Sequence, residues 1–244
     1  MRRLGFEPSD IAEIEGVFSC SCLSVEGVAT HLAVCDSLDV GDTEFTNLQV
    51  KRFADVVKAL GGKGYDVGKL HVQSSYGIYN FPGIKCDFAR PGIAMYGVMS
   101  HNGGTKVMPS LRPVLSLRAR VVQVRWIGAG EGVSYGRLFT SDRRMKLATV
   151  GVGYADGVPR QLSGNGGMCI VNGCSVPIVG RICMDMLMLD VTGVDSVAAG
   201  DVVTVIGCDG GEVIRCEDVA EASGTITNDI LCRLGGRLPR VYLD

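Results

Sequence analysis

The sequence has no surplus of either charge, few aromatic residues and no long apolar run. Of its 244 residues, 24 are Lys or Arg and 26 are Asp or Glu, which leaves a net charge of −2. Such a balance predicts no surface for nucleic acid or an anionic membrane. No stretch approaches the ~18 to 20 apolar residues that cross a bilayer, and no secretion-type leader opens the chain. These absences predict a cytoplasmic protein without nucleic-acid or membrane contacts.

Metal-binding cysteine motifs are also lacking. The chain has ten cysteines, but no paired C-x-x-C spacing of the zinc type. We therefore predict no metal site. Most cysteines lie in apolar, strand-like runs, as Cys183 does, which predicts reduced thiols that act as small core hydrophobes. Cys20-Ser21-Cys22 is the alternative, a possible ligand pair.

The first part of the chain alternates strand-like and helix-like segments. We predict strands at 26–32, 69–73 and 92–96 and an amphipathic helix at 44–60. Repeated βα units indicate a parallel sheet. A closed (β/α)8 barrel of the TIM type takes about 250 residues, so residues 1–105 supply about half of one.

The second part, residues 106–244, is predicted to be mostly β and follows a linker of turn-forming residues at 101–105. Apolar and polar residues alternate from Leu115 to Val122, as in a half-buried strand. Asn172-Gly173 predicts a tight hairpin, since both central positions of that turn need positive φ. Further strands are expected at 184–191 and 201–206, and a short helix at 217–222 that ends at Gly224.

Three glycine-bracketed motifs follow one another in the second part. They are Gly132-Val133-Ser134-Tyr135-Gly136, Gly153-Tyr154-Ala155-Asp156-Gly157 and Gly180-Arg181-Ile182-Cys183-Met184-Asp185-Met186. One such piece is weak evidence in a chain with 34 glycines, but the ordered set resembles the carboxy-terminal domain of the pyridoxal-phosphate-dependent alanine racemase family. Upstream, residues 90–97 resemble the end of the family's cofactor barrel, and residues 28–33 resemble one of its inner strands.

The family's cofactor lysine has no counterpart in this sequence. Lys58, in Val56-Val57-Lys58-Ala59, lies downstream of the His31 strand rather than far upstream of it. It also falls in a helical pattern of apolar residues, so we predict an exposed lysine on an outer helix. Met1-Arg2-Arg3-Leu4-Gly5 resembles an internal segment of the family. The resemblance therefore implies an amino-terminally truncated chain whose catalytic lysine lies in sequence not present.

The resemblance implies roles for residues that would hold pyridoxal 5'-phosphate. Arg90 would meet the pyridine nitrogen and His31 would lie beside the cofactor. Gly92 and Ile93 would offer backbone N–H groups to the phosphate, and Ser75 would add a hydroxyl. For Arg90, an ordinary surface salt bridge is the structural alternative.

Racemisation removes a proton from one face of Cα and returns it to the other, so it needs two bases. By resemblance the missing lysine is one base, and Tyr135 from the second subunit of a head-to-tail homodimer is the other. Tyrosine side chains ordinarily have a pKa of about 10, so such a base needs nearby positive charge or hydrogen bonds. The alternative for Tyr135 is a structural tyrosine in a glycine-rich turn.

The substrate implied is alanine or serine. Arg3 and the backbone N–H of Met184 would hold its carboxylate, while Tyr154 and Asp185 would line the entrance or be structural. Asn228 stands where alanine-specific members carry a tyrosine, which leaves room and a polar partner for a serine hydroxyl. This resembles the serine-accepting racemases of glycopeptide-resistance operons. The alternative for Asn228 is a helix N-cap.

The sequence thus predicts part of an amino-acid racemase for cell-wall precursor synthesis, inactive without its lysine. The rival hypothesis is a non-catalytic remnant or assembly fragment that binds no cofactor. A decarboxylase of the same barrel type is disfavoured by the motifs around Tyr135 and Met184.

Overall fold

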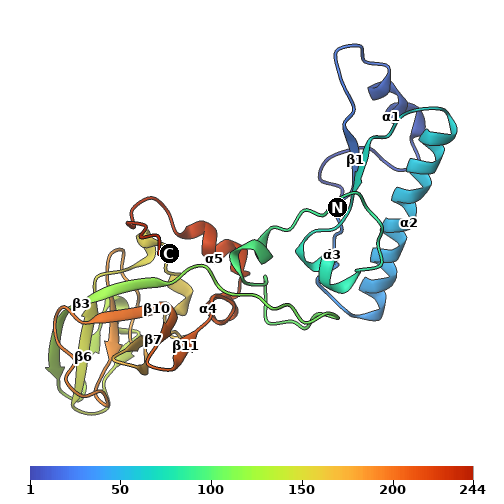
Figure 1. The fold of residues 1–244 in the computed structure, drawn as a ribbon. Helices are drawn as coiled ribbons and strands as arrows, with labels where there is room; N and C mark the ends of the chain where they lie inside the picture. The colour runs from blue at the N-terminus through green and yellow to red at the C-terminus, as the bar shows by residue number, and fades with distance from the viewer. Residues whose placement is uncertain (244) are drawn as a thin grey trace. The chain divides into compact units, whose positions relative to one another are not determined.

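A computed structural model describes residues 1–243, which divide into two compact units (Figure 1). Unit 1 comprises Met1–Met95 and Gly103–Leu111. Unit 2 comprises Tyr96–Asn102 and the chain from Arg112 onward. The predicted linker at 101–105 therefore spans a point where the chain passes from unit 2 back to unit 1.

Unit 1 contains the predicted βα repeat. Strands β1 (Gly27–Ala29) and β2 (Lys69–His71) pair in parallel, with Val28 opposite Leu70. Helix α2 (Val40–Gly62) connects them, as a parallel crossover requires. Helices α1 (Ile11–Phe18) and α3 (Ser75–Asn80) complete the unit. Both strands are shorter than predicted, and α2 is longer.

Helix α2 follows the apolar spacing of its sequence. Phe53, Val56, Val57 and Leu60 recur at helical intervals; Val56 and Leu60 are buried, and Leu60 is fully so. Lys58 lies between these positions and is exposed, as predicted. Burial of the apolar stripe therefore orients α2, and Lys58 stays exposed at its side.

The strand predicted at 92–96 is wrong. Residues Ile93–Tyr96 form a 3-10 helix, η1. The N–H groups of Gly92 and Ala94 donate to Ser75 Oγ, at 3.0 and 3.2 Å, instead of to the carbonyls of a neighbouring strand. Arg90 stands just before this segment. It lies in an irregular segment, where its N–H donates to Gln73 O at 2.8 Å.

Unit 2 is built around a seven-stranded antiparallel sheet in the order β8-β7-β10-β3-β6-β9, with β11 paired to β10 (Figure 1). The strands are β3 (Leu117–Ile127), β6 (Met145–Val150), β7 (Met168–Val171), β8 (Cys174–Pro177), β9 (Leu187–Asp190), β10 (Val202–Asp209) and β11 (Glu212–Ile214). A separate two-stranded ribbon joins β4 (Gly132–Val133) to β5 (Phe139–Thr140).

Local sequence patterns decide much of this sheet. In β3, Leu117 and Val121 are buried while Arg118 and Arg120 are exposed, as the alternation predicts. The β7–β8 hairpin turns at Asn172 and Gly173, whose φ values of 50° and 72° confirm the predicted turn.

Short helices complete unit 2. They are the 3-10 turns η2 (Tyr135–Arg137), η3 (Tyr154–Asp156) and η4 (Arg160–Leu162), and the helices α4 (Cys216–Ala222) and α5 (Thr227–Arg233). Helix α4 confirms the prediction at 217–222. Gly224, with φ of 67°, follows its C-cap and allows the chain to leave the helix.

The cysteine prediction is only partly correct. All ten thiols are free, but only Cys35, Cys169 and Cys216 are buried. Cys183 is half-buried and lies in a turn rather than a strand. The apolar neighbours of a cysteine in sequence therefore did not fix its burial. Among residues 1–243 no group of His, Cys, Asp and Glu is arranged to hold a metal ion.

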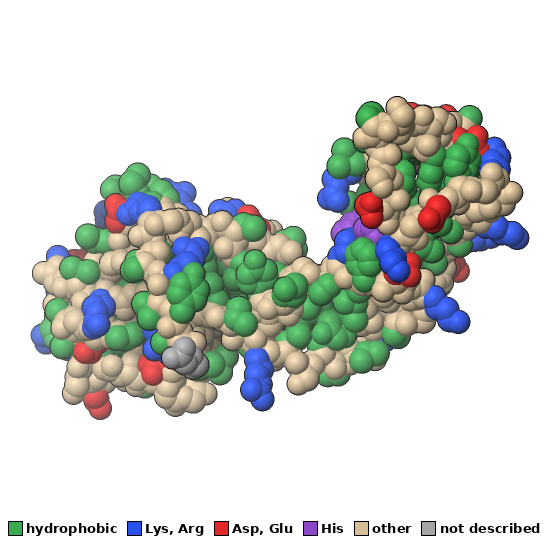
Figure 2. Space-filling view, turned by 45° about the horizontal axis from the view of Figure 1, so that its top comes forward, with side chains coloured by type: hydrophobic (Ala, Val, Ile, Leu, Met, Phe, Trp, Pro, Cys, Tyr) green, Lys and Arg blue, Asp and Glu red, His purple; other side chains and the backbone are tan. Residues whose placement is uncertain are grey.

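Hydrophobic side chains also lie on the surface of both units (Figure 2). In unit 1 they include Leu4 and Val40, which are 93% and 76% exposed. None of the helices formed by the described residues is long and apolar enough to cross a membrane.

Candidate active site

Arg90 is held in unit 1 by a set of oxygen and nitrogen acceptors. Its Nη2 donates to the carbonyl of Thr30, next to β1, at 2.8 Å, and its Nη1 donates to the carbonyl of His71, in β2, at 2.9 Å. Nη1 also contacts His71 Nδ1. The guanidinium thus bridges both strands of the parallel sheet. This arrangement is not the surface salt bridge considered from sequence.

His71 is a site residue that sequence reasoning missed. Its ring stacks on Phe88 with centroids 4.5 Å apart, and burial together with the charge of Arg90 lowers its pKa. The pKa of His31 is also lowered, by partial burial first and then by the charges of Arg90 and Arg3. The charges of Arg90 and Arg3, two residues predicted separately, thus both act on His31. The place of His71 within the strand predicted at 69–73, four residues before Ser75, was the available signal.

A second group in unit 1 forms around Ser75. Its side chain is 3% exposed, and its hydroxyl accepts the N–H groups of Gly92 and Ala94 at the start of η1. Ile93 lies between these two residues and is buried. Two backbone donors and a hydroxyl converge at one point, without a carboxylate among them. Ala94 is thus a second N–H donor to the Ser75 hydroxyl, and the N–H of Ile93 stays the predicted donor to a phosphate.

Tyr135 lies in the short ribbon of unit 2, in the η2 turn between β4 and β5, and is 69% exposed. The turn is tight: φ is 63° at Ser134, 65° at Gly136 and 46° at Arg137. A side chain at position 136 would crowd the Arg181 guanidinium, because its Cβ would stand 3.2 Å from Nη1. The tyrosine is thus presented on a constrained turn with an arginine beside it.

Ser134 carries backbone strain directly before Tyr135. Its φ of 63° and ψ of −173° lie in a region that is essentially reserved for glycine. Its hydroxyl donates to the carbonyl of Arg181 at 2.6 Å and lies 3.4 Å from Cys183 Sγ. The hydrogen bond therefore ties the Tyr135 turn to the third glycine-bracketed motif. Non-glycine residues in this region cluster at functional sites.

The second and third motifs are joined by backbone hydrogen bonds. The N–H of Tyr154 donates to Cys183 O and that of Ala155 to Met184 O, both at 3.0 Å. Gly153 lies so close to the third motif that a Cβ would approach Cys183 O and Met184 O at 2.3 Å. The tertiary structure therefore brings the turn that carries Tyr154 against the segment that carries Met184 and Asp185.

Asn228 does not cap a helix. The N-cap of α5 is Ile226, and Asn228 lies in the first turn. Its Oδ1 accepts a hydrogen bond from Ser100 Oγ at 2.7 Å. The N-cap alternative is thus wrong, and the observed role of the asparagine oxygen is to hold the 96–102 segment against α5.

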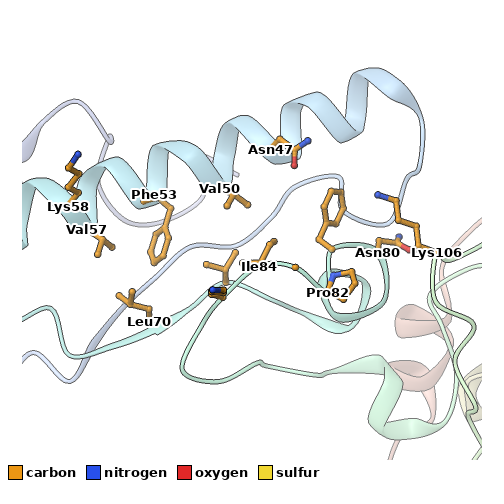
Figure 3. A pocket seen from close by; sticks show the side chains of 15 residues that line it. Asn47, Val50, Phe53, Val57, Lys58, Leu70, Asn80, Pro82, Ile84 and Lys106 are labelled. Carbon is orange, nitrogen blue, oxygen red and sulfur yellow. Dashed lines mark hydrogen bonds between the residues drawn. The ribbon is translucent and has the colours of Figure 1, made fainter.

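The cavity of unit 1 lies away from these residues. Its volume is about 740 Å³, and Val50, Phe53 and Val57 point from α2 toward Leu70 and Ile84 across it (Figure 3). The side chain of Leu70 lines this cavity, whereas the ring of its neighbour His71 contacts Arg90. Because successive strand residues face opposite sides, the cavity and the Arg90 group lie on opposite faces of the β1–β2 sheet. Lys58, which also lines the cavity, is therefore on the wrong face to join the Arg90 group.

Comparison with known proteins shows to which family the chain belongs. Residues 1–100 match the model described as "Alanine racemase, N-terminal domain", and residues 114–242 match "Alanine racemase, C-terminal domain". The chain belongs to the alanine racemase family.

Relatives within the family are similar over most of the chain. Alanine racemase from Geobacter sulfurreducens is 39% identical over 223 residues, which are 91% of this chain and 58% of the relative. An amino-acid racemase from Enterococcus faecalis is 39% identical over 239 residues, or 98% of this chain and 34% of the relative. The chain thus spans only about three-fifths or less of the length of these relatives.

Solved structures confirm the predicted fold class, a partial (β/α)8 barrel followed by a mostly β domain. Alanine racemase from Streptomyces coelicolor A3(2) superimposes with a TM-score of 0.90 at 32% identity, covering 100% of this chain and 64% of that one. Alanine racemase from Bartonella henselae, solved with covalently bound pyridoxal phosphate, has a TM-score of 0.83 at 33% identity, with 100% and 64% covered.

Proposed function

We propose that this chain is part of a pyridoxal-phosphate-dependent racemase that interconverts the enantiomers of alanine, serine or both. The observation that carries the proposal is the placement of family-motif residues in unit 1. The Arg90 guanidinium is fixed across two parallel strands, and a convergent N–H and hydroxyl group lies at Ser75.

The donors around Ser75 suit the cofactor's phosphate. Gly92 and Ala94 present N–H groups at the start of η1, and both point at one oxygen, that of the Ser75 hydroxyl. A phosphate oxygen would accept these N–H groups in the same way, and the Ser75 hydroxyl would then donate to it. Because this group contains no carboxylate, it would not repel a bound anion such as a phosphate.

Arg90 would face the pyridine nitrogen. A guanidinium has only N–H donors and remains charged, so an atom that it contacts has to be an acceptor. His71 and Thr30 fix its plane through their carbonyls, which holds the remaining donors in one direction. Arg90 would thus keep the ring nitrogen unprotonated. When bound, the cofactor supplies the electron sink for loss of the Cα proton.

Tyr135 would hold and return one of the two protons. The strained Ser134 and the glycine at 136 leave the phenol 69% exposed, so its hydroxyl is available to a site outside its own turn. A head-to-tail homodimer, in which Tyr135 serves the partner's site, belongs to this proposal. Arg3 and the N–H of Met184 would hold the substrate carboxylate, with Tyr154 at the entrance.

The second candidate function is a remnant that binds no cofactor. The positions of the lysines favour this candidate for the 244-residue chain by itself. Among the residues that the structure describes, no lysine contacts Arg90, His71 or Ser75 in a hydrogen bond or ion pair. Lys58 lies on the opposite face of the β1–β2 sheet, and Lys69 is 3.9 Å from Asp87 in an exposed pair. We therefore expect that the polypeptide by itself does not bind the cofactor covalently.

A fusion protein tests the proposal. The segment of the Geobacter sulfurreducens relative that precedes its matched region would be joined before Met1; we refer to this fusion as the chimera. We expect the chimera to bind pyridoxal phosphate and to racemise L-alanine or L-serine, as measured by chiral chromatography. The matched control is the chimera with Arg90→Leu, which should lose cofactor affinity. A folded chimera that binds cofactor but turns over neither amino acid would contradict the racemase assignment.

A further inference from the structure

Arg237 bridges two carboxylates that belong to different motifs. Its Nε lies 3.3 Å from Asp156 Oδ1, and its Nη2 donates to Asp185 Oδ1 at 2.6 Å. The Asp156 side chain is only 9% exposed, whereas those of Arg237 and Asp185 are each 53% exposed. Arg237 itself comes from neither motif, but from the segment after α5. Three stretches of chain that are distant in sequence therefore meet at one guanidinium.

Each carboxylate is part of a loop with a site residue. Asp156 Oδ2 accepts the N–H of Gly153 at 2.9 Å, which closes the turn that presents Tyr154. Asp185 directly follows Met184 in the third motif. The Arg237 guanidinium thus binds the Tyr154 turn through Asp156 and the Met184 turn through Asp185.

The two loops already touch through their backbones, by the hydrogen bonds from Tyr154 to Cys183 and from Ala155 to Met184. Two backbone bonds between short turns still allow the loops to open. A carboxylate on each side would also repel the other if no cation lay between them. The arginine supplies that cation, and its planar fork fixes the direction of both contacts.

We propose that Arg237 is a positioning residue that sets the relative place of the Tyr154 ring and the Met184 N–H. This inference rests on the proposed function, in which those two groups meet the substrate. Asp185 then acts through Arg237, as half of the bridge, and does not itself bind the substrate. Arg237 touches no reacting atom in this scheme.

The first test uses the 244-residue chain and amide hydrogen exchange measured by NMR. Arg237→Gln should speed exchange at the Tyr154 and Ala155 amides by roughly five- to tenfold, as expected from losing a partly exposed charged bridge. Amides of the β7–β8 hairpin should be unchanged. The matched control is Arg233→Gln, which removes an exposed arginine–aspartate pair within α5. Exchange unchanged within about twofold at Tyr154 and Ala155 would overturn the bridge.

The second test uses the chimera and separates positioning from folding. Arg237→Gln should raise KM for the amino acid about fivefold or more while kcat changes less, since ground-state placement of the carboxylate is affected. Arg237→Lys keeps the charge but not the fork, so it should rescue KM only in part. Faster exchange with an unchanged KM would show a purely structural role and overturn the proposal. An inactive parent chimera would count against the proposed function. Hydrogen exchange would then be the only test of whether Arg237 holds the two turns together.

Discussion

Strain at Ser134 predicts that glycine is more stabilising than alanine at this position. For a non-glycine residue, the observed φ of 63° and ψ of −173° cost about 1 to 3 kcal/mol. Ser134→Ala keeps that strain and loses the hydrogen bond to Arg181 O, a net loss of about 1 kcal/mol for a half-buried pair. Ser134→Gly loses the same bond but removes the strain.

The glycine variant also gains freedom when unfolded, which costs about 0.5 to 1 kcal/mol. Subtracting this from the strain relief leaves Ser134→Gly more stable than Ser134→Ala by up to about 2.5 kcal/mol. At positions without such strain, the alanine variant is the more stable of the two. The exposed Ser175 in β8 supplies the matched control, and there the alanine variant should be the more stable of the two.

The assay is urea unfolding followed by tryptophan fluorescence. Trp126, the single tryptophan of the chain, lies in β3 of unit 2 and therefore reports on the unit that contains Ser134. If Ser134→Ala is at least as stable as Ser134→Gly, the turn before Tyr135 stores no strain and the reasoning fails.

Four further predictions concern the site. In the chimera, Tyr135→Phe should slow proton exchange about 10²- to 10⁴-fold while leaving cofactor affinity largely intact. The measurement is deuterium uptake from solvent into each enantiomer in a single turnover. A minor effect that is equal for both enantiomers would show that Tyr135 is not the base. The 244-residue chain alone should be inactive and form no covalent adduct with pyridoxal phosphate; borohydride labelling of Lys58 or another lysine, located by mass spectrometry, would contradict this. In the chimera, Asn228→Tyr should lower the ratio of kcat/KM for serine to that for alanine by roughly 10- to 100-fold, and a ratio unchanged within about threefold would return the substrate assignment to alanine. Because the folded pKa of His71 is below its ordinary value of 6.5, the folded state binds fewer protons than the unfolded state as the pH falls below 6.5. The stability of unit 1 should therefore decrease on acidification from about pH 7 to 5, by less in His71→Gln, and equal slopes in calorimetric scans would exclude His71 as the cause.

The family motifs make the racemase resemblance visible in the sequence because they are short and ordered along the chain. Tyr135, Tyr154 and Met184 each stand at a fixed place in a glycine-bracketed segment. Glycine is required where a Cβ would collide, as at Gly153 against the third motif. A glycine that such a contact requires is visible in the sequence itself.

Local periodicity likewise determined the elements whose neighbours are close in sequence. The Asn172-Gly173 turn needs only its own backbone angles, and the α2 stripe from Phe53 to Leu60 needs only helical spacing. In contrast, the segment at 92–96 has a strand-like composition but becomes η1, because its N–H groups are captured by Ser75, far back in the chain.

The tertiary structure alone decided which side chains act together. His71 joins Arg90, Asp185 joins Arg237, and Ser134 is held in a glycine-like conformation by the Arg181 carbonyl. In each case the partners are well separated along the chain, and no local pattern records their pairing. Packing brings them within hydrogen-bonding distance, and charge and geometry then fix the contact. The sequence by itself determined the family and the repeating elements, while burial and long-range hydrogen bonds determined how the site is built.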